Sequence, residues 1–373
     1  MHHIAVCIAV TVAVFCFVVG ILARHGAVVQ AATSVYVISL TLTQLLMSEL
    51  ASRPFLYRYP AFVSMLHFVG CWLFTASYWV VVGEPEKCHP RSFGSARRFL
   101  REIVPVALAL PAAVACNNIA LLYIGPGLNA VIGALTPMAT AMLSVLFGRR
   151  MAALAWAGLL IALAGAVFVS LSEAAATLDR ATGRHHLIGA AFSLAAVVCR
   201  SFKSVLQDRV LNVEAYGRGE AGSGEERSLL ADKSEPISPM HLWAVQSPPM
   251  VIVSLAYALC TESVEGAVRH LSPQNVALIL ITCVSATTLN IMSAVTIKAL
   301  GASLMQAIGK LNVFVLIAFS VSFLDEVLPL KVAIGAGILL LGILVFERAE
   351  MPSAKEVGRR RARDTFWLKA SKV

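Results

Sequence analysis

Charged residues are scarce in this chain of 373 residues: they make up 14% of it, whereas hydrophobic residues make up 58%. Soluble domains carry about 25% charged residues. The low share of charge excludes an ordinary soluble globular protein and predicts an integral membrane protein. Acids are the scarcer sign, with 21 Asp and Glu against 30 Lys and Arg.

Motifs for metal binding and catalysis are also missing. The eight cysteines show no CxxC spacing, and the pairs His2-His3 and His185-His186 have no companion at ligand spacing. The chain holds no GxSxG or HExxH motif, and the apolar runs hold no paired carboxylates. We therefore expect no metal, no cofactor and no enzymatic activity. A membrane-embedded transferase would need acids or histidines grouped to bind metal or shuttle protons, and these runs lack such groups.

Apolar runs long enough to cross a bilayer follow one another along the chain. About 17–25 apolar residues in a helix span the hydrocarbon core, and a helix satisfies its backbone polar groups without water. We predict an all-α membrane protein with spans at about 4–22, 33–50, 60–82, 102–123, 127–147, 153–172, 188–209, 240–260, 275–298, 303–323 and 330–347. The long connection 212–238 has the composition of a disordered linker.

Basic residues lie mostly outside the spans, and their placement predicts an orientation. With residue 33 on the cytosolic side, the cytosolic loops and the tail 348–373 hold 20 Lys and Arg, against six on the other side. The net charge of +9 is therefore better explained by the positive-inside rule and lipid contact than by nucleic acid, which we do not expect as a partner. The first span, 4–22, lacks a basic start, so an uncleaved extra helix within 1–32 is favoured over a signal peptide.

The spans suggest an internal duplication. At one constant offset along the chain, Gly158 matches Gly335, Gly165 matches Gly342 and Ala130 matches Ala307. We predict two five-helix repeats, 33–172 and 188–347, joined by a loop at 173–187. An odd number of spans per repeat gives the repeats opposite topology, which is typical of alternating-access transporters.

Almost the only full charges inside the spans are Arg200, Lys203 and Lys310. A cation at the centre of a membrane helix costs about 2.5–3.5 kcal/mol unless it faces a cavity or a partner. Arg200 and Lys203 are three positions apart and share a helix face. With almost no buried acid to neutralise them, these cations predict a cavity that receives an anion. The alternatives are snorkelling for Lys203 and pairing with a backbone carbonyl for Lys310.

Other polar residues within the spans are candidate ligands. Gln306 and Gly309 share a stripe with Lys310, and Gly309 would let a ligand approach the helix closely. The remaining candidate substrate contacts are Asn312, Asn129, Thr136, Asn118 and Asn290. Interhelical hydrogen bonding is an equally good explanation for most of these.

Two stretches of the chain resemble a known family. The run from Asn129 to Pro137, NAVIGALTP, resembles the stretch NQAIGATTP of the nucleotide-sugar and triose-phosphate translocators in the drug/metabolite transporter superfamily. The run from Cys199 to Gln207, CRSFKSVLQ, is similar to the family segment ARALKSVLQ. The resemblance covers about 35–347. It implies ten helices in two inverted five-helix halves, with 4–22 as an extra helix, and exchange of a phosphorylated sugar for a nucleoside monophosphate or phosphate.

The chain departs from the family pattern at two points. The family's Gln-x-x-Gly-Asn-x-Lys is here Gln306 to Asn312, QAIGKLN, with lysine and asparagine exchanged. The Lys-Arg pair that phosphate translocators carry next is replaced by Val313 and Phe314. This replacement argues against a simple triose-phosphate carrier.

These observations lead to a functional hypothesis. We expect an antiporter that exchanges a nucleotide sugar for a nucleoside monophosphate in the Golgi or endoplasmic reticulum membrane. The alternative is a sugar-phosphate/phosphate translocator of a plastid-like membrane. The expected partners are an anionic small molecule and the lipid bilayer, and a homodimer is compatible with them.

Overall fold

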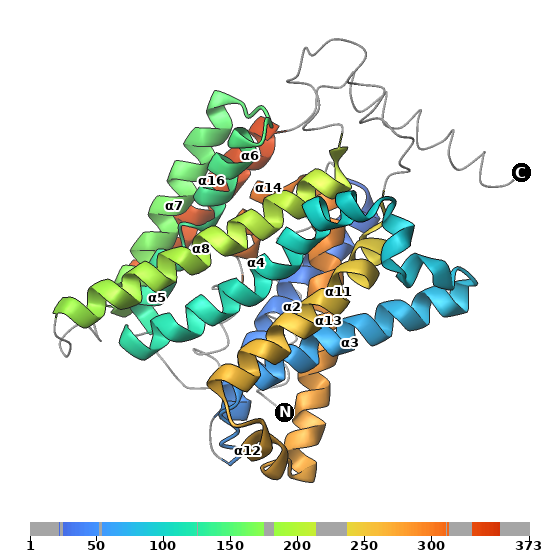
Figure 1. Ribbon diagram of the computed structural model, residues 1–373. Helices are drawn as coiled ribbons and strands as arrows, with labels where there is room; N and C mark the ends of the chain where they lie inside the picture. Colours follow the sequence, from blue (N-terminus) through green and yellow to red (C-terminus); the bar gives the residue numbers. More distant parts are fainter. Residues whose placement is uncertain are drawn as a thin grey trace, which may run out of the picture.

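The protein is described by a computed structural model that covers residue 22 and residues 25–51, 54–124, 126–174, 183–213, 237–310, 312 and 330–350. Within these residues the chain is helical and has no strand (Figure 1). Six of the described helices are long and apolar enough to cross a membrane: α2 (Ala27–Ala51), α3 (Pro60–Val82), α4 (Ala96–Tyr123), α8 (Gly183–Leu211), α11 (Pro239–Thr261) and α13 (Pro273–Leu300). The predicted all-α membrane class is confirmed.

Some predictions fall on residues that the structure does not describe. The extra span 4–22 lies outside the described residues except for Leu22, and so do most of the linker 212–238 and the tail beyond 350. The predicted span 303–323 is described only as far as Lys310, together with Asn312.

Serine caps and prolines define where several long helices begin. Ser95, Ser238 and Ser272 each accept a backbone hydrogen bond from the third residue of the helix that follows. Such caps satisfy one of the backbone N–H groups that have no partner within the helix. Proline follows directly after Ser238 and Ser272, where its missing N–H costs nothing.

The span predicted at 127–147 is two helices. Helix α5 (Pro126–Gly133) ends before helix α6 (Thr136–Leu146) begins. Pro137 lies in the first turn of α6, so it starts a new helix rather than kinking a continuous one. Helix α14 (Ala302–Gly309) is also short and ends at Lys310. A break between half-helices at membrane depth is tolerated where protein or a cavity satisfies the freed backbone groups.

Helix bounds recur along the chain at the offset seen in the sequence. Helices α4 and α13 have equal lengths of 28 residues, and their first residues, Ala96 and Pro273, are separated by the same offset as Gly158 and Gly335. The starts of α7 (Ala153–Ala174) and α16 (Leu330–Glu350) differ by that offset as well. The contacts are also reciprocal: α4 packs on α8 as α13 packs on α2, while α3 packs on α11 and α7 on α16.

Glycines hold α7 and α16 together at close range. A Cβ on Gly158 would lie 2.9 Å from the Gly342 carbonyl oxygen, and a Cβ on Gly165 would lie 2.7 Å from the Gly335 carbonyl oxygen. At the constant offset Gly158 corresponds to Gly335 and Gly342 to Gly165, so the two contacts are equivalent and their partners are exchanged. Close approach through small residues is a common way to associate helices in lipid.

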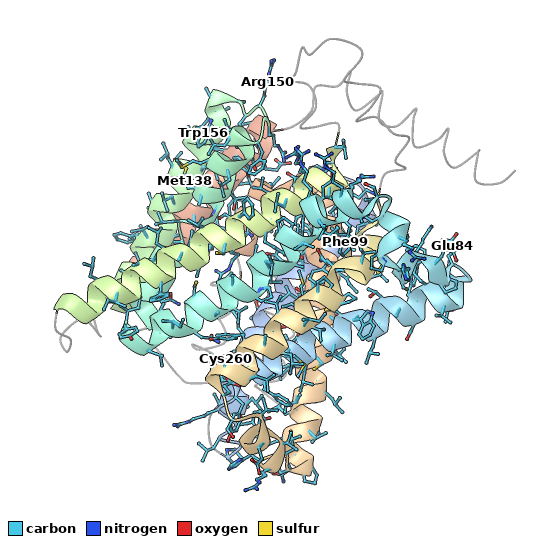
Figure 2. The ribbon with its side chains drawn as sticks, in the orientation of Figure 1. Glu84, Phe99, Met138, Arg150, Trp156 and Cys260 are labelled. Atoms are coloured by element: carbon cyan, nitrogen blue, oxygen red, sulfur yellow. The ribbon has the colours of Figure 1, made fainter. Side chains whose placement is uncertain are left out.

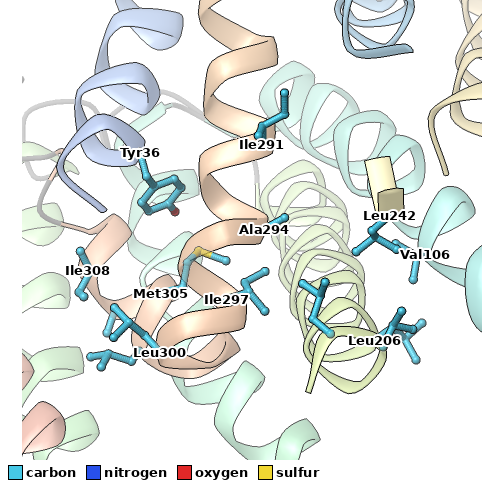
Figure 3. Packing of buried hydrophobic residues seen from close by; sticks show 14 of the residues in the cluster. Tyr36, Val106, Leu206, Leu242, Ile291, Ala294, Ile297, Leu300, Met305 and Ile308 are labelled. Atoms are coloured by element: carbon cyan, nitrogen blue, oxygen red, sulfur yellow. The ribbon is translucent and has the colours of Figure 1, made fainter. Parts of the chain in front are cut away.

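One part of the apolar core lies where α2, α8, α13 and α14 meet. Its buried side chains include Ile297, Leu300, Met305 and Ile308 (Figure 3). Tyr36 of α2 stands beside α13 and α14 in the same view, and its side chain is only 6% exposed. The half-helix α14 is therefore enclosed by its neighbours, which fixes the position of Lys310 at its end.

Candidate functional site

Lys310 stands at the break between helices. It is the C-cap of α14, and its ammonium donates a hydrogen bond of 2.7 Å to the carbonyl oxygen of Gly133, the last residue of α5. This bond uses one of the three N–H donors of the ammonium. It is the pairing with a backbone carbonyl that the sequence allows as the alternative for Lys310. Among the described residues this ammonium has no other hydrogen bond, which leaves two N–H donors for a ligand.

Arg200 and Lys203 approach this point from α8. The guanidinium of Arg200 interacts electrostatically with the ammonium groups of both Lys203 and Lys310. Among the described residues no carboxylate forms an ion pair with any of these three side chains. We call Arg200, Lys203 and Lys310 the basic cluster. Three like charges in one buried place repel each other unless an anion joins them.

Lys203 does not snorkel to the membrane surface. Its side chain is buried, and the ammonium lies 5.8 Å from the ring centroid of Trp243 on α11. A cation near an indole gains some electrostatic stabilisation, which in part offsets the cost of burying it.

Tyr36 and Gly309 meet at the basic cluster. A Cβ on Gly309 would lie 2.6 Å from the Tyr36 hydroxyl oxygen, so only glycine leaves room for it there. The same hydroxyl interacts electrostatically with Arg200. Gly309 was expected to let a ligand approach, and in this structure the tyrosine hydroxyl occupies that space.

Two further predicted residues, Gln306 and Thr136, bond to α8 near the basic cluster. The Gln306 amide donates to the Ser204 hydroxyl at 2.7 Å, which ties α14 to α8. Thr136 donates to the Gly133 carbonyl at 2.7 Å, and its own carbonyl accepts from Ser201 at 3.2 Å. Helix α8 therefore bonds both to α6, through Ser201, and to α14, through Ser204.

Asn129 lies in α5, and its side chain bonds to two other helices. Its amide oxygen accepts from Ser193 at 2.6 Å, and its amide nitrogen donates to Asn117 at 3.1 Å. Both partners also belong to membrane-spanning helices. Asn129 therefore makes interhelical bonds in this conformation.

The other three asparagines contact different helices. Asn312 donates to Gln44 of α2 at 2.7 Å, and Asn290 donates to the Cys71 sulfur at 3.3 Å, which joins α13 to α3. Asn118 is a hydrogen-bond partner of Tyr257, which joins α4 to α11. No hydrogen bond among the described residues brings these three to the basic cluster.

A narrow pocket adjoins Lys310. Its lining is otherwise apolar and includes Pro137, Met138, Ala307 and Leu339. The space holds about one water molecule. A sugar phosphate or nucleotide does not fit in this pocket, whose lining includes Lys310 but neither Arg200 nor Lys203.

Sequence reasoning missed a second polar group beside the cluster. Gln207 donates to Gln246 at 3.2 Å, and both side chains are fully buried. The other amide atoms of this pair, Gln207 Oε1 and Gln246 Nε2, and the indole nitrogen of Trp243 have no partner among the described residues. Gln207 lies seven positions after Arg200, which is two helical turns on the same face, and that spacing could have identified it.

The arrangement of the basic cluster is suited to binding an anion. Within the described residues no group of three His, Cys, Asp or Glu could hold a metal ion. Guanidinium and ammonium donors that converge without a carboxylate match phosphate oxygens.

Comparisons with known proteins agree on a transporter family. The model of the triose-phosphate transporter family matches residues 51–347. A probable sugar phosphate/phosphate translocator of Arabidopsis thaliana is 24% identical over 305 residues, which is 80% of this chain and 75% of the relative. UDP-uronic acid transporter 1 of the same plant is 24% identical over 307 residues, which is 81% of this chain and 89% of the relative.

A solved crystal structure shares the fold. It aligns with a TM-score of 0.61 at 13% sequence identity, and the alignment covers 88% of this chain and all of that one. At this identity the likeness concerns the fold alone.

Proposed function

Because the chain belongs to the triose-phosphate transporter family, we propose that it is an alternating-access antiporter that exchanges a nucleotide sugar for a nucleoside monophosphate. The proposed location is an endomembrane, of the Golgi or the endoplasmic reticulum. The bilayer and an anionic sugar-phosphate or nucleotide-sugar substrate follow from the family. The exchange mode and the substrate are the proposal.

The basic cluster is the observation that carries this proposal. Arg200, Lys203 and Lys310 come from α8 and the end of α14, and both lysines lie within electrostatic reach of Arg200. Among the described residues none of the three has an acidic partner in an ion pair. A bound phosphate or diphosphate would neutralise them. The empty carrier would then hold repelling charges, which favours exchange over release without a counter-substrate.

A nucleotide is favoured because recognition groups extend beyond the phosphate site. The Gln207–Gln246 pair and the Trp243 indole nitrogen offer one acceptor and two donors that lack partners among the described residues. A nucleoside extends beyond its phosphate and has hydrogen-bonding edges that can satisfy such groups. One relative is a UDP-uronic acid transporter by name.

Alternating access is supported by the recurrent helix bounds and by the paired breaks. We propose that residues 33–172 and 188–347 form two inverted repeats, and that they rock about the α5–α14 contact. Transporters built this way place their substrate at broken helices near the bilayer midplane.

A sugar-phosphate/phosphate translocator is the second candidate. Three relatives carry that description as probable. Against it stands the sequence after the basic cluster, where Val313 and Phe314 replace the cationic pair of phosphate translocators.

Uptake into proteoliposomes separates the two candidates. Vesicles preloaded with a nucleoside monophosphate should take up at least one labelled nucleotide sugar faster than empty vesicles. Stimulation by inorganic phosphate with no stimulation by any nucleotide would select the second candidate. If no preload stimulates uptake, the antiport claim is wrong.

A further inference from the structure

Asp208 is a buried carboxylate in the last turn of α8, a turn that also carries Arg209. Its side chain is fully buried, and Oδ2 accepts from Arg149 Nη1 at 2.5 Å and from the backbone N–H of Ala302 at 3.1 Å. Oδ1 accepts from Asn212 at 2.7 Å. We call the side where the ends of α6, α8 and α13 meet the basic end.

Arg149 reaches Asp208 from the other half of the chain. It lies in the short turn between α6 and α7, whereas its partner lies in the last turn of α8. Its guanidinium rests on Gly301, whose φ of 84° favours glycine, and a Cβ at that position would overlap the guanidinium. The site therefore accepts the arginine only because residue 301 has no side chain.

This ion pair holds the half-helix that ends in Lys310. Ala302 is the first residue of α14, and Asn212 also donates to the carbonyl oxygen of Ile297 in the last turn of α13 at 3.1 Å. Asp208 thus fixes the junction of α13 and α14 to α8. Gln306, Gly309 and Lys310 follow on the same half-helix.

The chemistry of the contact suits a reversible closure. Breaking an ion pair is costly when its carboxylate stays buried without a cation. The cost is small when the helices separate and water can hydrate the carboxylate. Arg149 is partly exposed, with 17% of its side chain accessible, so the basic end is the side from which water can enter.

We propose that Arg149 and Asp208 form a latch that closes the basic end in one state and opens once in each transport cycle. The proposal rests on the proposed function. It assigns Asp208 and Arg149 as positioning residues that act on Lys310 through α14.

A cysteine behind the latch reports its opening. Ser303 follows Ala302 and is 2% exposed, so a Ser303→Cys variant of the full chain in nanodiscs should react slowly with a membrane-impermeant maleimide. Adding Arg149→Gln or Asp208→Asn should accelerate labelling of this cysteine by about tenfold. The labelling is measured by mass spectrometry of the peptide that contains it. Asp208→Asn keeps the volume and an oxygen for the Ala302 N–H. Both changes together should label no faster than either alone, because they break the same contact.

Two controls separate latch opening from general loosening. Arg150 is exposed and points away from the helices (Figure 2), so Arg150→Gln should leave labelling unchanged. A cysteine at Ser285, buried within α13, should label at one rate with or without Arg149→Gln. Arg149→Lys, which keeps the charge, should restore slow labelling in part.

The outcomes are distinct. If folded Arg149→Gln and Asp208→Asn proteins label at the rate of the Ser303→Cys parent, the latch is wrong. If Ser285→Cys accelerates equally, the contact is merely structural and the latch is also wrong. Failure of the proposed function appears separately, as no uptake of any substrate by the unmodified protein.

Discussion

The Lys310 ammonium bonds to the carbonyl oxygen of Gly133, and the two residues are 177 positions apart. The same offset separates α4 from α13 and the start of α7 from that of α16. The bond therefore joins equivalent points of two recurring helix sets, at the ends of α5 and α14. A ligand that competes for Lys310 at this place would change how those sets meet.

Loss of the Lys310 charge should reduce exchange. We expect Lys310→Met to lower the rate of substrate exchange by about 10- to 100-fold, since a charge-assisted hydrogen bond is worth about 1.5–3 kcal/mol. Lys298→Met is the control, because that lysine bonds the Ile237 carbonyl instead. Exchange assays in proteoliposomes measure both. Equal activity of the two variants would remove Lys310 from the site.

Replacing Gly309 by alanine should destabilise the protein through Tyr36. The new Cβ would meet the hydroxyl oxygen at 2.6 Å but the ring carbon Cζ at 3.5 Å. Overpacking of this kind costs about 1–3 kcal/mol. Tyr36→Phe removes the clashing atom, so the double variant should regain most of the melting temperature lost by Gly309→Ala. Additive losses would mean that the two residues do not touch.

The crossing of α7 and α16 should tolerate no side chain at Gly342. A Cβ there would lie 2.6 Å from the Ala162 Cα and 2.7 Å from the Gly158 carbonyl oxygen. Gly337 on the same helix has nothing within 4 Å of an added Cβ. Thermal unfolding should show a lower melting temperature for Gly342→Ala and an unchanged or slightly higher one for Gly337→Ala. The reverse order would contradict the packing.

Tyr57 should make the protein sensitive to alkali. It lies in the turn between α2 and α3, and its hydroxyl donates to the Ala267 carbonyl oxygen at 3.0 Å. Burial, with Tyr59 and Glu262 adding to it, raises its pKa from 10.0 to about 12. When the pKa of a phenol is higher in the folded than in the unfolded protein, it stabilises the fold at pH values below the unfolded-state pKa. This stabilisation is lost as the pH rises through the folded-state pKa. Between about pH 10 and about pH 12 the wild type should therefore lose more melting temperature than Tyr57→Phe. Parallel curves would contradict this.

The helical membrane fold was predictable because it depends on composition and run length. Apolar runs and serine caps are local signals, and they define most of the long helices. The break between α5 and α6 was not predicted. The run 127–147 is uniformly apolar, and Pro137 can either kink a helix or begin one.

The site was predictable only in part. Arg200, Lys203 and Lys310 are visible in the sequence because cations are rare in apolar runs. Which of the polar residues join them depends on helix rotation and packing, which local sequence does not encode. Hence Tyr36 was missed, whereas Asn290 and Asn118 turned out to bond other helices.

Ligand-induced stabilisation tests most directly whether Arg200 and Lys310 form one anion site. A ligand that binds the folded state raises its melting temperature in proportion to the logarithm of its concentration over Kd. In a panel of nucleoside mono- and diphosphates, nucleotide sugars and sugar phosphates, at least one should stabilise the wild type. The shift should vanish in Arg200→Gln and in Lys310→Met. A shift of the same size in both variants would contradict the claim that these cations hold the substrate.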